Sequence, residues 1–191
     1  MLKSRFGALW VGVSAAMVAT AVAVPSWAGT CAPSTTCPTT VTFTVSAGDG
    51  LEITVPDGPV SIGTGGAGSQ VSDEIGTVTV VDDRAALTAT WIASVTATDF
   101  TTGGGTAAET VPNTAVRYWS GPATSTTGTG TFVAGQLNAA SAVVLDQTRT
   151  AFSKTTGSGN NSAVWTPTVV VDIPTGAVAG LYTGTVSHSV A

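Results

Sequence analysis

The side chains that most often perform catalysis are scarce in this chain of 191 residues. There is one histidine, His188, and there are two cysteines, Cys31 and Cys37. A nucleophilic triad needs a base beside a serine or cysteine, whereas His188 falls in the apolar register of a strand pattern. One imidazole cannot supply a histidine-based zinc site. The sequence therefore predicts no catalytic residue and no metal site, and it places His188 in the core or at its rim.

Carboxylates offer two further kinds of chemistry. Glycoside hydrolysis needs two carboxyl groups about 5–10 Å apart across a cleft, and Glu52, Glu74 and Glu109 are the candidates. The sequence spacing does not pair them, so a secreted carbohydrate-active protein stays an alternative. The loop carboxylates at Asp73-Glu74 and Asp82-Asp83 suit a hard cation. We expect a non-enzymatic protein without a cofactor, and a structural calcium ion is the alternative.

The start of the chain has the features of a secretory signal peptide. Lys3 and Arg5 precede an apolar run over 6–24, and Ser26-Trp27-Ala28 puts small residues at the positions that a signal peptidase reads. We predict cleavage after Ala28. The alternative is a membrane anchor, because the apolar run is just long enough to span a bilayer. The sequence thus predicts a secreted or wall-associated extracellular protein that has no membrane segment after cleavage.

The two cysteines lie in a Pro/Ser/Thr-rich stretch directly after this segment. In an exported protein, two nearby cysteines are typical of a disulfide, so we expect Cys31 and Cys37 to be bonded within an irregular arm over residues 29–40. Removal of residues 1–28 leaves four basic against eleven acidic residues, a net charge of about −7. Such a surface repels nucleic acid and anionic lipid.

The rest of the chain, residues 41–191, alternates apolar and hydroxyl side chains with the two-residue period of half-buried strands. Segments 41–45 and 51–55 flank Gly48-Asp49-Gly50 and are expected to form a hairpin. Further strands are expected over the following ranges: 75–81, 87–97, 115–119, 149–154, 163–173 and 181–191. We expect a Thr/Gly loop over 124–131 and one turn of helix within 136–143. Pro167 suggests an edge strand or a bulge.

Roughly eight to ten strands separated by Gly/Pro turns predict an all-β fold, an antiparallel β-sandwich in one domain. Residues 63–68 match the glycine pattern of dinucleotide-binding loops. That pattern binds phosphate only where a helix opens at its end, and the residues after Gly68 lack helical periodicity. We therefore interpret residues 63–68 as a loop and not as a nucleotide site.

Aromatic side chains are the remaining candidates for binding. Trp91 and Trp165 lie on inward faces and are expected in the core. Tyr118 and Trp119 are adjacent, so they point to opposite faces and one of them is exposed. An exposed ring can stack on a sugar or anchor a partner. The candidate binding residues are Tyr118, Trp119, Trp91, Trp165, Tyr182 and His188.

The last strand, from Tyr182 to Val190, resembles the terminal motif of WxL-type cell-surface domains. His188 stands at the place of the tryptophan and Val190 at the place of the leucine. The strand around Trp91 resembles the earlier tryptophan strand of this family, with Ala93 at the place of its leucine. The resemblance covers residues 43–190 and is a divergent one, of the secreted Gram-positive or actinobacterial type.

This resemblance implies a secreted β-sandwich that binds the cell wall non-covalently through peptidoglycan. The leading expectation is therefore a non-enzymatic cell-surface protein whose partners are cell-wall polysaccharide, peptidoglycan or other surface proteins. One alternative is a structural subunit of an extracellular assembly, because an N-terminal arm and long Thr-faced strands can pair edge to edge or donate a strand. The other is a secreted carbohydrate-binding or carbohydrate-active protein.

Overall fold

The structure is a computed structural model, and it describes residues 32–36 and 38–191. Residues 1–28, predicted to be a signal peptide, and Cys31 and Cys37, predicted to be bonded, lie outside the described residues, so both predictions stay predictions. The chain divides into two compact units, residues 1–43 and 44–191. The described residues of the first unit contain a turn in which Thr35 N–H donates to Ala32 O, and they contain no helix or strand.

The second unit contains all the strands of the described chain. They are β1 (Leu51–Thr54), β2 (Gln70–Glu74), β3 (Val78–Asp82), β4 (Trp91–Ala97), β5 (Phe100–Thr101), β6 (Thr110–Val111), β7 (Val116–Trp119), β8 (Ala123–Thr127), β9 (Phe132–Ala134), β10 (Val143–Val144), β11 (Arg149–Lys154), β12 (Asn161–Trp165), β13 (Thr168–Asp172) and β14 (Val186–Val190). Three single turns of 3-10 helix are η1 (Ala107–Glu109), η2 (Asn113–Ala115) and η3 (Ala139–Ser141). Within the described ranges, no helix is long and apolar enough to cross a membrane.

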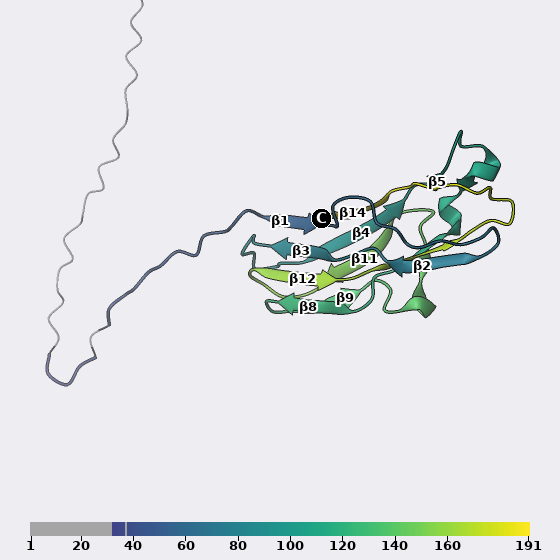
Figure 1. Cartoon of the computed structure of the whole chain (residues 1–191). Helices are drawn as coiled ribbons and strands as arrows, with labels where there is room; N and C mark the ends of the chain where they lie inside the picture. Colours follow the sequence, from purple (N-terminus) through teal and green to yellow (C-terminus); the bar gives the residue numbers. More distant parts are fainter. Residues whose placement is uncertain (1–31, 37) are drawn as a thin grey trace, which may run out of the picture. The chain divides into compact units, whose positions relative to one another are not determined.

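The strands form three four-stranded antiparallel sheets and one small two-stranded sheet (Figure 1). Sheet A has the order β1-β3-β12-β8, sheet B the order β10-β7-β13-β2, and sheet C the order β14-β4-β11-β9. The small sheet pairs β5 with β6. The predicted all-β antiparallel fold is confirmed. The described residues contain fourteen strands instead of eight to ten, because the expected strand 163–173 is divided into β12 and β13 and because the sequence pattern did not indicate β2, β5, β6, β8, β9 and β10.

Sheets A and B form one creased layer. Three strands of sheet B continue into strands of sheet A after a break of two or three residues: β2 into β3, β7 into β8, and β13 into β12 in reverse chain order. Gly76 and Gly121 have positive φ at two of the breaks, and Pro167, which has no N–H to donate, lies at the third. Of the two alternatives predicted for Pro167, the edge strand is wrong because β12 and β13 are both central, whereas the bulge has a counterpart in the register shift between β12 and β8 at Val164 and Trp165. Pro167 interrupts a long strand at the crease.

Sheet C packs as a second layer on this creased layer. The ring of Phe152 on β11 stacks on that of Trp165 on β12, with 4.9 Å between ring centroids. Trp91 Nε1 on β4 donates to Asn161 Oδ1 on β12 at 2.8 Å. These contacts join the two layers, and the side chains of Trp91, Phe152 and Trp165 are at most 2% exposed. The inward alternation of each layer therefore closes a β-sandwich core.

The predicted hairpin between 41–45 and 51–55 is wrong. Gly48 N–H donates to Asp83 O, and Asp83 N–H donates to Gly50 O, so residues 48–54 continue alongside β3. The chain does not reverse at Gly48–Gly50, and residues 41–46 are outside every strand. The side chains of Val41, Phe43 and Val45 are 81%, 87% and 74% exposed.

Three other expected boundaries are also corrected. β4 begins at Trp91 and not at Leu87, which is exposed, because Ala85 has a positive φ and residues 83–90 are irregular, with bends at Arg84 and at 87–88. The Thr/Gly stretch expected as a loop contains β8, which pairs with β12. The last strand begins at Val186, five residues later than Leu181. The single helical turn expected within 136–143 is confirmed by η3.

Candidate functional site

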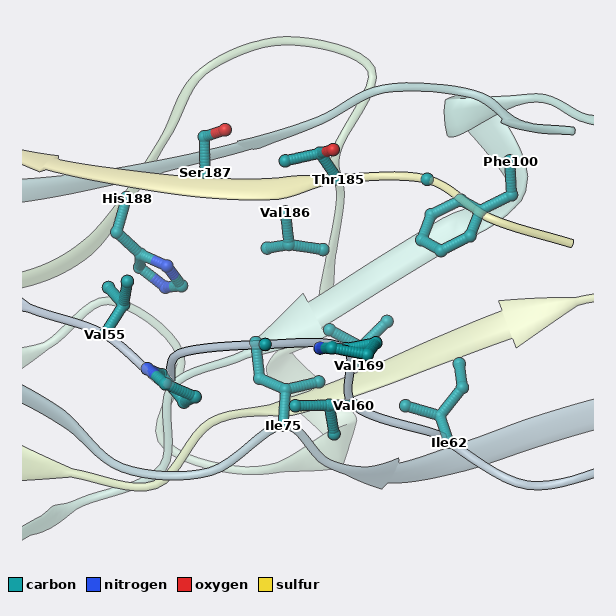
Figure 2. A pocket seen from close by; sticks show the side chains of 14 residues that line it. Val55, Val60, Ile62, Ile75, Phe100, Val169, Thr185, Val186, Ser187 and His188 are labelled. Carbon is teal, nitrogen blue, oxygen red and sulfur yellow. The ribbon is translucent and has the colours of Figure 1, made fainter.

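The second unit has an apolar groove on its surface. It consists of two adjoining cavities of about 520 and 840 Å³ that share Pro59, Val60, Ile62, Phe100 and Gly184. Figure 2 shows the lining of the smaller cavity. Protein pockets that take small ligands have volumes of about 300–1,000 Å³. The groove is therefore large enough for several side chains of a ligand or partner.

The groove lies between two strand edges that have no partner on the side facing it. β2 pairs with β13 alone, and β14 pairs with β4 alone. Apolar residues of β13 and β14 line the space between them, and Figure 2 shows Val186 and His188 pointing into it while Ser187 points away. The alternation of β14 thus gives the groove an apolar wall, as the sequence predicted for that strand.

One wall of the groove is an extended segment, residues 56–65, which we call the strap. Pro56 and Pro59 have no N–H, and no residue of the strap makes a backbone–backbone hydrogen bond. Gly63 N–H donates to Ser61 Oγ within the strap at 3.4 Å. Side-chain packing therefore holds most of the strap in place, and apart from Gly63 N–H its backbone polar groups have no hydrogen-bond partner in the fold.

The rim of the groove exposes apolar side chains. Val60 is 46% exposed, Val178 is 45% exposed and Leu181 is 86% exposed, and all three line the larger cavity. Where the two cavities adjoin, a Cβ on Gly184 would lie 2.6 Å from the ring of Phe100, so only glycine allows the chain to pass this ring. The groove therefore has a closely packed floor and an apolar, solvent-exposed entrance.

His188 lies where the groove meets the core. Its Nε2 is 3.2 Å from Tyr118 Oη, and Trp165 Nε1 donates to the same oxygen at 3.3 Å. Because Tyr118 accepts from Trp165, its hydroxyl proton is free to be donated to a neutral imidazole. Burial lowers the pKa of His188 to about 4, and burial raises the pKa of Tyr118 above its usual value. The pair is thus neutral at pH 7.

A second polar cluster is buried in the core, away from the groove-lining residues. The Asp82 carboxylate accepts hydrogen bonds from Arg84 Nε at 2.8 Å and from Arg84 Nη2 at 2.9 Å. It also accepts one from Asn161 Nδ2 at 3.1 Å. Hydrogen bonds from the Arg84 guanidinium are the main reason that the pKa of Asp82 is lowered. Because its carboxylate is engaged inside the fold, Asp82 is a poor calcium ligand. Among the residues described, no three His, Cys, Asp or Glu side chains are grouped to hold a metal ion.

The structure separates the six predicted binding residues into two groups. Trp91, Trp165 and Tyr118 are buried, as the inward faces predicted for the two tryptophans require, so none of these rings can stack on a ligand. Trp119, Tyr182 and His188 are partly exposed. Tyr182 and His188 line the groove, whereas Trp119 lies outside its lining.

Sequence reasoning missed most of the groove. Residues 63–68 were interpreted as a loop, residues 56–62 were assigned to no strand, and Phe100, Val178 and Leu181 were not singled out as a group. A usable signal existed: Val55, Val60 and Ile62 are apolar, and the two prolines between them favour an extended backbone that forms no ladder.

The comparisons with known proteins do not identify a family for this chain. The chain matches no protein-family model, no curated protein and no solved structure. The similarity to WxL-type domains therefore stays a prediction from the sequence, and the function has to be argued from the groove itself.

Proposed function

We propose that the protein is a non-enzymatic structural subunit of an extracellular surface assembly. The observation that carries this proposal is the apolar groove, which has an exposed rim and a wall without backbone partners. Exposed apolar surface of this kind is typical of protein interaction sites. An extended segment is a suitable occupant, because it would supply both side chains for the cavities and backbone groups for the wall.

The polar side chains support a structural role. Arg84, Arg117 and Arg149 form ion pairs within the second unit, with Asp82, Asp172 and Asp146 respectively. The fourth basic side chain outside the predicted signal peptide, Lys154, is buried with its Nζ donating to Ala89 O. The strongest ionic and hydrogen-bonding groups are therefore used to hold the fold together.

The three glutamates considered for glycoside hydrolysis give that alternative little support. Glu109 accepts hydrogen bonds from the N–H and the hydroxyl of Thr106, which lower its pKa. Glu52 and Glu74 lie on β1 and β2, and neither lines the groove. An activity screen on polysaccharides, with Glu52→Gln and Glu74→Gln as variants, tests the enzyme alternative directly.

Light scattering after size-exclusion chromatography tests the assembly proposal. The protein expressed from the full-length coding sequence should form species larger than a monomer, and their share should rise with concentration. Fractionation of the producing cells should recover these species outside the cytoplasm. A strict monomer at every concentration, or a cytoplasmic location, contradicts the proposal.

Non-covalent wall association is the second candidate, and Trp119 favours it. This ring is partly exposed on β7 and is followed by β8, whose Thr and Ser side chains are exposed. A ring beside hydroxyl groups suits stacking on a sugar. Purified peptidoglycan should retain the protein, with or without calcium, and Trp119→Ala should reduce the retained fraction. Protein left wholly in the supernatant contradicts this candidate.

A further inference from the structure

The segment Thr40–Ser46 has the composition of a strand that the fold does not use. Val41, Phe43 and Val45 alternate with threonines, which is the pattern of a strand with one buried face. Yet these three side chains are 81%, 87% and 74% exposed, and the segment pairs with no strand. A row of large apolar side chains in water is typical of an interaction site.

The groove offers an apolar environment and free backbone groups, which the segment Thr40–Ser46 does not find within the fold. Its two cavities are apolar, and the strap along one side makes no hydrogen bond to another backbone group. An added strand would bury one face of alternating side chains in the cavities and would hydrogen-bond its backbone to the wall.

Residues 41–45 cannot fill the groove of their own chain, because the chain between them and Gly48 is too short to reach it. Gly48 is fixed by its hydrogen bond to Asp83, and the groove lining begins at Val55, seven residues later and about 23 Å away in an extended chain. A chain that turned back before Gly48 would bring only Val41 level with Val55. Phe43 and Val45 would then lie beside β1, where β14 is already packed. A second copy has no such constraint.

We propose that residues 41–45 of one copy enter the groove of a second copy as an added strand, with Val41, Phe43 and Val45 facing its cavities. This inference rests on the proposed function as an assembly subunit, and it names the partner of the groove. Each copy has one donor segment and one groove, so the contact is head-to-tail. Such contacts generate open chains unless the rotation closes a ring.

Matched substitutions in the donor segment test the contact. Phe43→Asp should weaken self-association about 30-fold or more, because it replaces a buried aromatic anchor with a charge. Thr44→Asp adds the same charge on the opposite face of the strand. This variant should form the same series of oligomers as the parent protein. Both side chains are outside the core, so circular dichroism should show the same fold as the parent protein.

A mixture of two defective variants tests the direction of the contact. Val60→Asp places a charge in the groove and leaves the donor segment intact. Alone, it should be monomeric, as Phe43→Asp should be. Mixed in equal amounts, the two should form dimers and nothing larger, because one groove and one donor segment remain functional. Oligomers beyond dimers in this mixture overturn the head-to-tail arrangement.

A synthetic peptide of residues 39–47 provides a measurement that does not depend on assembly. Added to the Phe43→Asp protein, it should slow hydrogen exchange of strap amides, whereas the peptide with aspartate at position 43 should not. If neither peptide protects the strap, the inference is overturned. If the parent protein assembles and Phe43→Asp assembles equally well, the inference fails while the proposed function stands. If the parent protein is monomeric at every concentration, both the inference and the proposed function are contradicted.

Discussion

The two ends of the sandwich differ in how far their apolar side chains are buried and in how far their polar groups are hydrogen-bonded. At the closed end, Trp91, Phe152 and Trp165 pack between the layers, and Asp82, Arg84 and Asn161 complete one another's hydrogen bonds. At the open end, apolar side chains reach solvent and the strap has no backbone partner. The closed end accounts for stability, so the open end is where a partner can add contacts without disturbing the fold.

Hydrogen exchange should show the largest difference between the ends. Strap amides lack a backbone acceptor and should exchange with an opening free energy near zero. Amides of β12, a central strand, should require global unfolding, at about 5–15 kcal/mol for a typical domain. Mass spectrometry of exchanged peptides measures both. Similar protection of the two segments in a monomeric sample would contradict the distinction between the ends.

Truncating one apolar side chain at each end should give unequal losses of stability. Trp165→Ala leaves a cavity in the core and should lower the free energy of unfolding by about 3–5 kcal/mol. Leu181→Ala removes an exposed side chain and should change it by less than about 0.5 kcal/mol in the monomer. Urea unfolding followed by far-ultraviolet circular dichroism measures each change, with Phe43→Asp as the monomeric background.

Acid should weaken the fold through His188, at the junction of the two ends. The pKa of this imidazole is lowered from 6.5 to about 4, so the unfolded chain takes up a proton at a higher pH than the folded one. The free energy of unfolding should therefore fall as the pH decreases from 6.5 to 4. His188→Gln keeps an acceptor for Tyr118 and should flatten this decline. An unchanged decline in His188→Gln assigns the pH dependence to other groups.

Substitutions of Lys154 test how the closed end tolerates a buried charge. Its Nζ is buried, donates to Ala89 O at 2.8 Å and lies 5.8 Å from the centroid of the Phe132 ring. Lys154→Met keeps the volume and removes a desolvated charge, so stability should change by less than about 1 kcal/mol or increase. Lys154→Ala should lose about 2–4 kcal/mol through the cavity. If both variants lose the same free energy of unfolding, the ammonium group, and not the volume of the side chain, stabilises the fold.

Sequence reasoning predicted the candidate site only in part. The register of β14 was predicted correctly, so His188 and Val186 were expected on an inward face, and they line the groove. The inward positions of Trp91 and Trp165 follow from the same alternation and are confirmed by their burial. Alternation identifies a face because successive strand side chains point in opposite directions. It does not identify the partner strand, which is why the strap and the unpaired segment 41–45 were missed.

The sequence by itself determined the all-β class and the inward faces of the main strands, because these depend on local periodicity. The tertiary structure alone decided that residues 48–54 run along β3, that Pro167 lies in a crease of two central strands, and that β2 and β14 leave a groove between them. Strand pairing depends on contacts between residues far apart in the chain, which local patterns do not specify.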